Sequence, residues 1–233
     1  MDINESVSII EQEISQLFSG KQPKELYQPM QYMLGLNAHR TFPQLTLWGS
    51  YLFAGAVQPA LVPATGVEVF YGFFLIHDDL LEHKSSRNNQ QSIHTRWNNN
   101  IAILSGDAMI FKALELLIQV ETPLIKPTVK LFNKCFTEIC EQKQRELSDT
   151  FGKSELPEPC HRILAGFSMC LGAMIGGANH QELQVVDKLA RSLGTGLKNT
   201  TPELYQAIES LNCDQQRKDH FLAWISRSSV GCK

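Results

Sequence analysis

The six cysteines of this 233-residue chain lack the close pairing that a structural zinc site needs. They are Cys135, Cys140, Cys160, Cys170, Cys213 and Cys232. Cys135 and Cys140 are the closest two, and no second pair follows them at a matching distance, as the ligands of a zinc site usually do. Because no secretory leader is apparent and intracellular thiols stay reduced, we expect free thiols and no disulfides.

The chain also lacks a strong charge of one sign and a long apolar run. Its 21 basic and 24 acidic residues leave a net charge of −3, which argues against a broad nucleic-acid or anionic-membrane surface. The first residues lack the basic and apolar segments of a signal peptide. The longest apolar run in the middle of the chain, residues 69–76, is too short to span a bilayer. We expect a cytoplasmic protein with no transmembrane segment and no nucleic-acid partner.

Helical spacing of apolar residues extends along almost the whole chain, and alternating strand-like runs are few. The spacing predicts helices over residues 4–18, 27–35, 43–53, 67–82, 101–120, 129–148, 162–174 and 181–197, with one or two short helices after Pro202. Thr65 and Gly66 are expected to precede the fourth helix, Pro123 and Pro127 to bracket a break, and residues 83–91 to form a loop. No repeat or linker is present. We predict an all-α fold in a single domain over residues 1–233.

The most informative segment is LIHDDLLE, at the end of the fourth predicted helix. Asp78 and Glu82 are one helical turn apart and share a face, and Asp79 is adjacent. A divalent cation would relieve the repulsion between such carboxylates, and Mg²⁺ prefers one or two of them together with substrate phosphates. Lys84 and Arg87 follow and could hold a diphosphate. The pattern alone leaves open an ordinary acidic helix end that faces water.

Residues 74–117 resemble the first aspartate-rich region of the polyprenyl diphosphate synthases. The stretches LIHDDLLE, SIHTRWNNNIAILSGDAM and FKALELL are similar to the family's DDxxD, its RRG, a following histidine and an ILxGD helix. Upstream, residues 23–43 resemble the helix ahead of the family's GGKRxRP motif. Downstream, residues 171–178 fit its later core helices. The resemblance covers about residues 7–197.

The resemblance implies the all-α isoprenoid synthase bundle, in which Mg²⁺ binds an allylic prenyl diphosphate. Ionisation of that substrate gives an allylic cation, which isopentenyl diphosphate attacks. Asp78 and Glu82 would be Mg²⁺ ligands, and Asp78 and Asp79 the catalytic acids. Glu146 would supply a further ligand, since it falls at the last position of the family's EGQxxD motif.

The same resemblance implies residues that bind substrate. Arg87 falls at the first arginine of RRG and would hold the allylic diphosphate. His39 and Arg40 fall within the GGKRxRP motif, and His94 falls at the family's histidine. Phe73 and Phe74 directly precede the acids, where bulky residues form the floor of the chain-length pocket in short-product members. Plain core packing is the alternative for these two rings.

Several cations of the family pattern are replaced in this chain. The replacements are His39 for the lysine and Phe42 for the last arginine of GGKRxRP, Asn88 for the second arginine of RRG, and Cys160 with His161 for a KT pair. Each lost charge-assisted contact to a diphosphate removes about 1.5–3 kcal/mol. We therefore expect weak binding of isopentenyl diphosphate.

The family's second aspartate-rich motif, FQxxDDxxD, is also missing. It should follow residues 194–197, but the chain continues with residues 198–202, KNTTP. Without it, part of the positive charge that neutralises a leaving diphosphate is lost. We expect a bundle that is truncated on its C-terminal side and has weakened activity.

The resulting prediction is a prenyltransferase of isoprenoid biosynthesis that binds Mg²⁺ and an allylic prenyl diphosphate. It would be a homodimer, or a heterodimer with a full-length synthase that completes its activity. One alternative is a non-catalytic, regulatory subunit of a heteromeric synthase. Another is a lyase similar to the terpene cyclases that uses DDxxE, although no second metal motif of that type is present.

Overall fold

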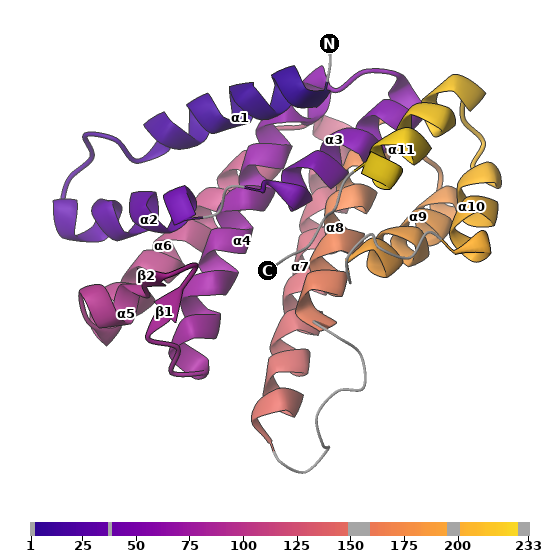
Figure 1. The fold of residues 1–233 in the computed structure, drawn as a ribbon. Coiled ribbons are helices and arrows are strands. Elements are labelled where there is room, and N and C mark those ends of the chain that lie inside the picture. Colours follow the sequence, from indigo (N-terminus) through magenta and orange to yellow (C-terminus); the bar gives the residue numbers. More distant parts are fainter. Residues whose placement is uncertain (1–2, 37–38, 149–158, 195–200, 228–233) are drawn as a thin grey trace. The chain divides into compact units, whose positions relative to one another are not determined.

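The computed structural model describes residues 3–36, 39–148, 159–194 and 201–227 (Figure 1). These residues form eleven α-helices, one short 3₁₀-helix and one two-stranded hairpin, so the predicted all-α class is confirmed. The chain divides into two compact units, Met1–Pro43 with Leu61–Gln119, and Gln44–Ala60 with Val120–Lys233. Each unit is described by itself. The single domain over residues 1–233 stays a prediction.

The first unit is built around one long buried helix. Its elements are α1 (Ile3–Leu17), α2 (Lys24–Leu36), α4 (Leu61–Leu81), β1 (Ser86–Arg87), β2 (Gln90–Gln91), α5 (Ile93–Arg96) and α6 (Asn99–Leu117). Helix α4 packs most extensively on α6 and also contacts α1 and α2. Asn98 caps α6, because its Oδ1 accepts a hydrogen bond from the Ile101 amide at 2.9 Å.

Helix α4 begins at Leu61, six residues before its predicted start at Val67. Thr65 and Gly66 were expected outside the helix, but the Thr65 hydroxyl donates to the Leu61 carbonyl at 3.3 Å within it. Packing against α6 overrides the weak helix propensity of these two residues. The segment Gln58–Leu81 has the length and the mean hydropathy, 1.5, of a membrane span, but 83% of its most apolar 18-residue window is buried in the protein, as in a core helix.

The polar residues 83–91, predicted as a loop, contain an antiparallel hairpin. Ser86 pairs with Gln91 and Arg87 with Gln90. Asn88 and Asn89 form the two-residue turn with φ values of 50° and 61°, a conformation that asparagine tolerates better than most residues. The strands are only two residues long and carry no apolar residue, so hydrophobic periodicity does not reveal them.

The second unit is built around α8, which is buried along most of its length. Its elements are α3 (Thr41–Ala54, from Gln44 onward), η1 (Gln58–Ala60), α7 (Thr122–Leu147), α8 (Pro159–Ile175), α9 (His180–Leu193), α10 (Pro202–Glu209) and α11 (Gln215–Arg227). Helix α8 packs on α7 and α9. Gly172 of α8 lies against the Thr46 carbonyl of α3, so close that a β-carbon at this position would collide with that backbone.

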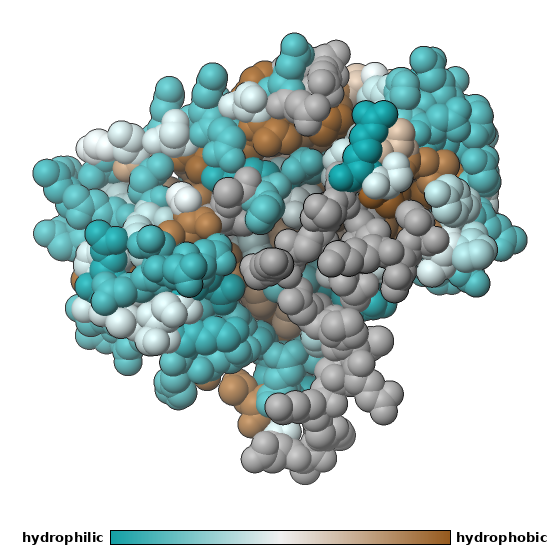
Figure 2. All heavy atoms as spheres, in the orientation of Figure 1, coloured by the Kyte–Doolittle hydropathy of each residue, from teal (hydrophilic) through white to brown (hydrophobic). Residues whose placement is uncertain are grey.

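Helix α7 is continuous, and the break predicted between Pro123 and Pro127 does not occur. Pro123 lies in the first turn, where a missing amide hydrogen costs little. Pro127 lies inside the helix and removes one backbone hydrogen bond. The side chains that follow, Thr128 and Phe132, are buried and hold the helix in place. Most of the coloured surface in Figure 2 is hydrophilic, as expected when apolar side chains fill the interior.

Candidate functional site

The acidic motif lies at the end of α4, within the first unit. Asp78 is 6% exposed and Asp79 is 1% exposed, whereas the Glu82 side chain is 37% exposed. A solvated acidic helix end therefore does not describe the two aspartates. Buried carboxylates require charged or hydrogen-bonding partners, and both have them.

Arg87 is the main partner of the two aspartates. Its Nη2 donates to Asp79 Oδ1 at 2.7 Å and to Asp78 Oδ2 at 2.9 Å, and its Nε donates to Asp79 Oδ1 at 3.0 Å. The hairpin brings Arg87 back over the end of α4. Tyr32 Oη donates to the Gln91 carbonyl at 2.7 Å, and Asn88 Nδ2 donates to the Leu36 carbonyl at 3.1 Å. Both contacts hold the hairpin against α2.

Lys84 bridges the two acids that are one helical turn apart. Its Nζ lies 3.1 Å from Asp78 Oδ2 and 2.6 Å from Glu82 Oε2. The three carboxylates and two cations of this cluster leave one net negative charge. Since the oxygens of Asp78 and Glu82 already converge on one cation, the geometry suits a positive charge at this position.

Burial and ion pairing shift the pKa values of the cluster in opposite ways. Burial raises the pKa of Asp79, and the contacts with Arg87 only partly oppose that shift. Burial would lower the pKa of Lys84, but its bonds to Glu82 and Asp78 outweigh this and raise the pKa. The pKa of Arg87 is raised for the same reason, through Asp79 and Asp78. Lys84 and Arg87 are therefore charged throughout the neutral range.

The donor atoms fit Mg²⁺. They are hard carboxylate oxygens, and the Lys84 ammonium stands in for the ion between Asp78 and Glu82. Among the described residues, no group of three or more His, Cys, Asp or Glu side chains is arranged to hold a metal ion. The protein would thus provide one or two ligands here and leave the rest to substrate phosphates and water, as is usual for Mg²⁺.

Glu146 lies near the end of α7, in the second unit. Its carboxylate accepts from Gln142 Nε2 at 3.1 Å and lies 2.9 Å from Lys143 Nζ. Because Asp78 and Glu82 belong to the first unit, the assignment of Glu146 to the same metal site stays a prediction.

Arg40 is 3% exposed and is engaged inside the first unit. Its guanidinium donates to Glu11 Oε1 and to Glu68 Oε1, each at 2.7 Å, and to the Leu34 carbonyl at 3.0 Å. These contacts join α1, α2 and α4, so Arg40 has a clear structural role. Its predicted role in substrate binding stays a prediction, as does that of the exposed His39.

The remaining predicted residues lie in the same unit. His94 is half-buried on α5, with Nδ1 at 3.3 Å from Ser92 Oγ. Phe73 and Phe74 are 6% and 5% exposed, and the Phe73 ring lies 4.5 Å from the His77 ring. Both the floor of a chain-length pocket and ordinary core packing would bury these two rings beside the acids. The role of Phe73 and Phe74 in chain-length control therefore stays a prediction.

Sequence reasoning missed the hairpin and the residue that anchors it, Tyr32. The signal that was available is the Asn88-Asn89 dipeptide, a turn signal between polar residues. Residues 195–200, where the family's second acidic motif would begin, lie outside the described residues, as do Asn37 and Ala38 of the GGKRxRP-like segment.

Comparison with known proteins places this geometry in a family. Residues 23–196 match the family model described as polyprenyl synthetase. The chain is 26% identical over 206 residues to a geranylgeranyl diphosphate synthase of Methanosarcina mazei, covering 84% of this chain and 64% of the relative. It is 25% identical over 228 residues to the heterodimeric geranylgeranyl pyrophosphate synthase small subunit, chloroplastic, of Arabidopsis thaliana, covering 91% and 66%.

Solved structures agree at the level of the fold. The geranylgeranyl pyrophosphate synthetase of Pyrococcus horikoshii matches with a TM-score of 0.75 at 23% identity, over 92% of this chain and 67% of that one. The chain spans less than two thirds of the length of the M. mazei relative. Since the family model matches well over half of the chain and the fold is that of the isoprenoid synthases, this chain belongs to the polyprenyl synthetase family.

Proposed function

We propose that this protein binds Mg²⁺ and an allylic prenyl diphosphate at the end of α4 and takes part in prenyl transfer in isoprenoid biosynthesis. One observation carries the proposal. Asp78 and Glu82 converge on a single cation, the Lys84 ammonium, at 3.1 and 2.6 Å. The M. mazei relative, described as a geranylgeranyl diphosphate synthase, supports the substrate class.

In this proposal Asp78 and Glu82 hold Mg²⁺, which supplies positive charge to a leaving diphosphate. Lys84 would have to leave these two carboxylates for the ion to bind there. Arg87 keeps its bonds to Asp79 and turns its remaining N–H donors to the diphosphate, since a guanidinium has five donors. Phe73 and Phe74 lie one turn before the acids and shield the allylic chain from water.

A thermal shift experiment tests the proposal. A ligand that binds only the folded state stabilises it by about 2.7 kcal/mol at a concentration of 100 times its Kd. We expect geranyl diphosphate to raise the melting temperature in the presence of Mg²⁺ and to have little effect in EDTA. The substitution Asp78→Asn should abolish the shift.

Asp219→Asn is the matched control, because Asp219 is an exposed aspartate of α11 in the other unit. This variant should retain the full shift. If wild-type melting is unchanged at millimolar geranyl diphosphate and Mg²⁺, the acidic motif does not bind this substrate and the proposal fails.

A second candidate is a non-catalytic, regulatory subunit that forms a heterodimer with an active synthase. Helix α6 supports it with an unusual set of exposed apolar side chains, Ile103 at 45%, Leu104 at 60% and Phe111 at 73%. Leu104 and Phe111 are two turns apart and share a face, and exposed apolar patches often mark protein interfaces. The A. thaliana relative is described as the small subunit of a heterodimer.

Size-exclusion chromatography with light scattering tests this candidate, for the chain alone and mixed with a full-length geranylgeranyl diphosphate synthase. We expect the mixture to form a complex that contains both chains, and the double substitution Leu104→Glu with Phe111→Glu to prevent it. Tyr205→Glu is the control, since Tyr205 is a 43% exposed aromatic of α10. Separate elution of the two proteins from the mixture would rule this candidate out.

A further inference from the structure

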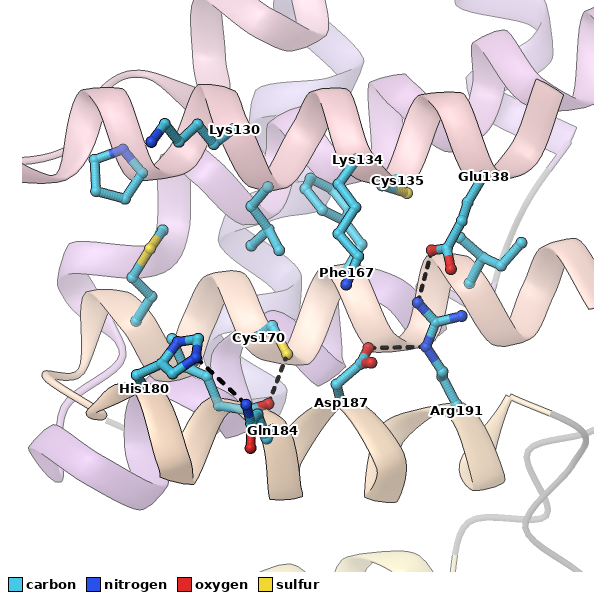
Figure 3. Close-up of a pocket in the computed structure, with 15 residues that line it drawn as sticks. Lys130, Lys134, Cys135, Glu138, Phe167, Cys170, His180, Gln184, Asp187 and Arg191 are labelled. Carbon is cyan, nitrogen blue, oxygen red and sulfur yellow. Dashed lines mark hydrogen bonds and ion pairs between the residues drawn. The ribbon is translucent and has the colours of Figure 1, made fainter. Parts of the chain in front are cut away.

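A cavity lies in the second unit, between α7, α8 and α9 (Figure 3). Its volume is about 510 Å³, within the range of about 300–1,000 Å³ that small-molecule sites occupy. Asp78, Glu82 and Glu146, the predicted metal ligands, are not among its lining residues. The cavity therefore needs an explanation of its own.

The floor of the cavity is an apolar strip on α8. Ile163, Phe167, Cys170 and Met174 follow one another at intervals of three or four residues, so they share one face of the helix. The Cys170 thiol donates to the Leu183 carbonyl at 3.5 Å, which fixes α9 beside the strip. This floor suits a hydrocarbon chain.

One end of the cavity is closed by a three-residue ion pair between α7 and α9 (Figure 3). Arg191 Nη2 lies 2.7 Å from Glu138 Oε2, and Arg191 Nε lies 2.9 Å from Asp187 Oδ1. Gly166 of α8 leaves the room that Asp187 and Arg191 occupy, because a β-carbon there would collide with the Asp187 carboxylate. The charge of Arg191 is thus neutralised within the protein.

The α7 wall carries two further cations, Lys130 and Lys134, one helical turn apart. Lys134 points from α7 toward Phe167 (Figure 3). Within the part of the chain that the structure describes, neither ammonium forms an ion pair, in contrast to Arg191. Two like charges at this spacing repel each other, so an anion between them would be favourable.

We propose that this cavity binds an elongated apolar molecule with one anionic end, a carboxylate or a phosphate. The hydrocarbon lies on the α8 strip, and the anion is held by Lys130 and Lys134. A wholly apolar ligand would leave both lysines without a partner, and a small polar anion would leave the strip uncovered. An amphiphilic anion satisfies both features of the cavity.

Isothermal titration tests the proposal with decanoate and decyl phosphate, below their micelle concentrations, at low salt and in EDTA. EDTA excludes binding through Mg²⁺ at the end of α4. We expect both anions to bind, decyltrimethylammonium to bind at least about tenfold more weakly, and inorganic phosphate to give no signal. Saturable binding of only one anion would show which head group is preferred and still support the proposal.

Two variants locate the binding. Lys130→Glu with Lys134→Glu should weaken the binding of both anions at least about tenfold, as expected when charge-assisted contacts become repulsive. Met174→Glu, which puts a carboxylate on the strip, should do the same. The matched control is Lys126→Glu with Lys188→Glu, since these exposed lysines lie on α7 and α9 outside the lining and give the same change in net charge.

Circular dichroism melting of each variant verifies that it is folded. The proposal is overturned if the wild type binds neither anion. It is equally overturned if the Lys130 and Lys134 variant binds as tightly as the wild type, or if the control loses as much affinity as that variant.

Discussion

At the scale of single residues, Lys84 is the feature that distinguishes this acidic motif. Its ammonium occupies the position between Asp78 and Glu82 that Mg²⁺ would take. The Lys84 ammonium and Mg²⁺ would then compete for the carboxylate oxygens of Asp78 and Glu82. The Lys84 side chain is 40% exposed, so its pairing is that of a surface salt bridge, worth about 0.2–1 kcal/mol.

We therefore predict that Lys84→Met tightens Mg²⁺ binding by about 1.5-fold to 5-fold, the factor that corresponds to such a salt bridge. The melting temperature without metal should fall slightly, because Asp78 and Glu82 then repel each other. Calorimetric titration with Mg²⁺ measures the first effect. Lys112→Met is the control, since Lys112 pairs with Glu115 on α6 at 2.8 Å. Equal Mg²⁺ affinity in all three proteins would show that Lys84 does not compete.

The cysteines give a second prediction at this scale. Burial raises the pKa of Cys170 to about 12 and raises that of Cys135 well above its ordinary value. The thiolate is the reactive form, and at pH 8 only about one Cys170 in ten thousand carries it. Cys140 is exposed. Iodoacetamide at pH 8 should label Cys140 well before Cys135 and Cys170, as read by peptide mass spectrometry, and equally fast labelling of Cys170 would contradict its burial.

At the scale of elements, the hairpin between α4 and α5 determines where Arg87 lies. Asn88 stands at the position of a family arginine, and the structure gives it a role in the turn, with φ at 50°. A β-branched residue is strained in this left-handed region by about 1–2 kcal/mol. The turn therefore contributes to the site without touching the acids.

We predict that Asn88→Val lowers the free energy of unfolding by about 1 kcal/mol through that strain. Because Arg87 is displaced, the variant should also lose part of the stabilisation by geranyl diphosphate with Mg²⁺. Urea denaturation and thermal shift measure the two effects. Asn89→Gly, which places glycine at φ 61°, should leave both nearly unchanged. An Asn88→Val variant as stable as the wild type would contradict the turn strain, and an undiminished ligand shift would show that the hairpin does not position Arg87.

Packing around Phe42 opposes the substitution that would restore the family's arginine at this position. It stands at the family's last arginine, yet it is 2% exposed and its ring lies 4.6 Å from that of Tyr71. An arginine here would bury an unpaired charge, at a cost of about 3–5 kcal/mol. His39 is exposed and can be changed without this cost.

At the scale of the whole molecule, the family resemblance implies that turnover needs two metal-binding faces, and we recognise one aspartate-rich motif in this sequence. We predict that His39→Lys improves binding of isopentenyl diphosphate by about tenfold, since the new cation adds about 1.5 kcal/mol. Turnover should rise little. Calorimetry and a radiolabel condensation assay measure the two quantities.

His39→Gln is the control for this prediction. It adds no cation, so it should not gain affinity for isopentenyl diphosphate. Ordinary wild-type turnover with micromolar affinity would show that other residues supply the missing contacts.

The sequence by itself determined the helical class, most helix positions and the acidic motif. These features depend on residues that are close along the chain, such as Asp78 and Glu82 at one turn's spacing, and local periodicity encodes them directly. Family membership follows from the same short stretches, and the family comparison bears it out.

Only the tertiary structure decided how these residues are used. The burial of Asp79, the return of Arg87 through the hairpin and the engagement of Arg40 by Glu68 depend on residues from different elements. So does the cavity between α7, α8 and α9. Contacts of this kind arise when helices pack, and no pattern within one helix specifies which side chain of another it will meet.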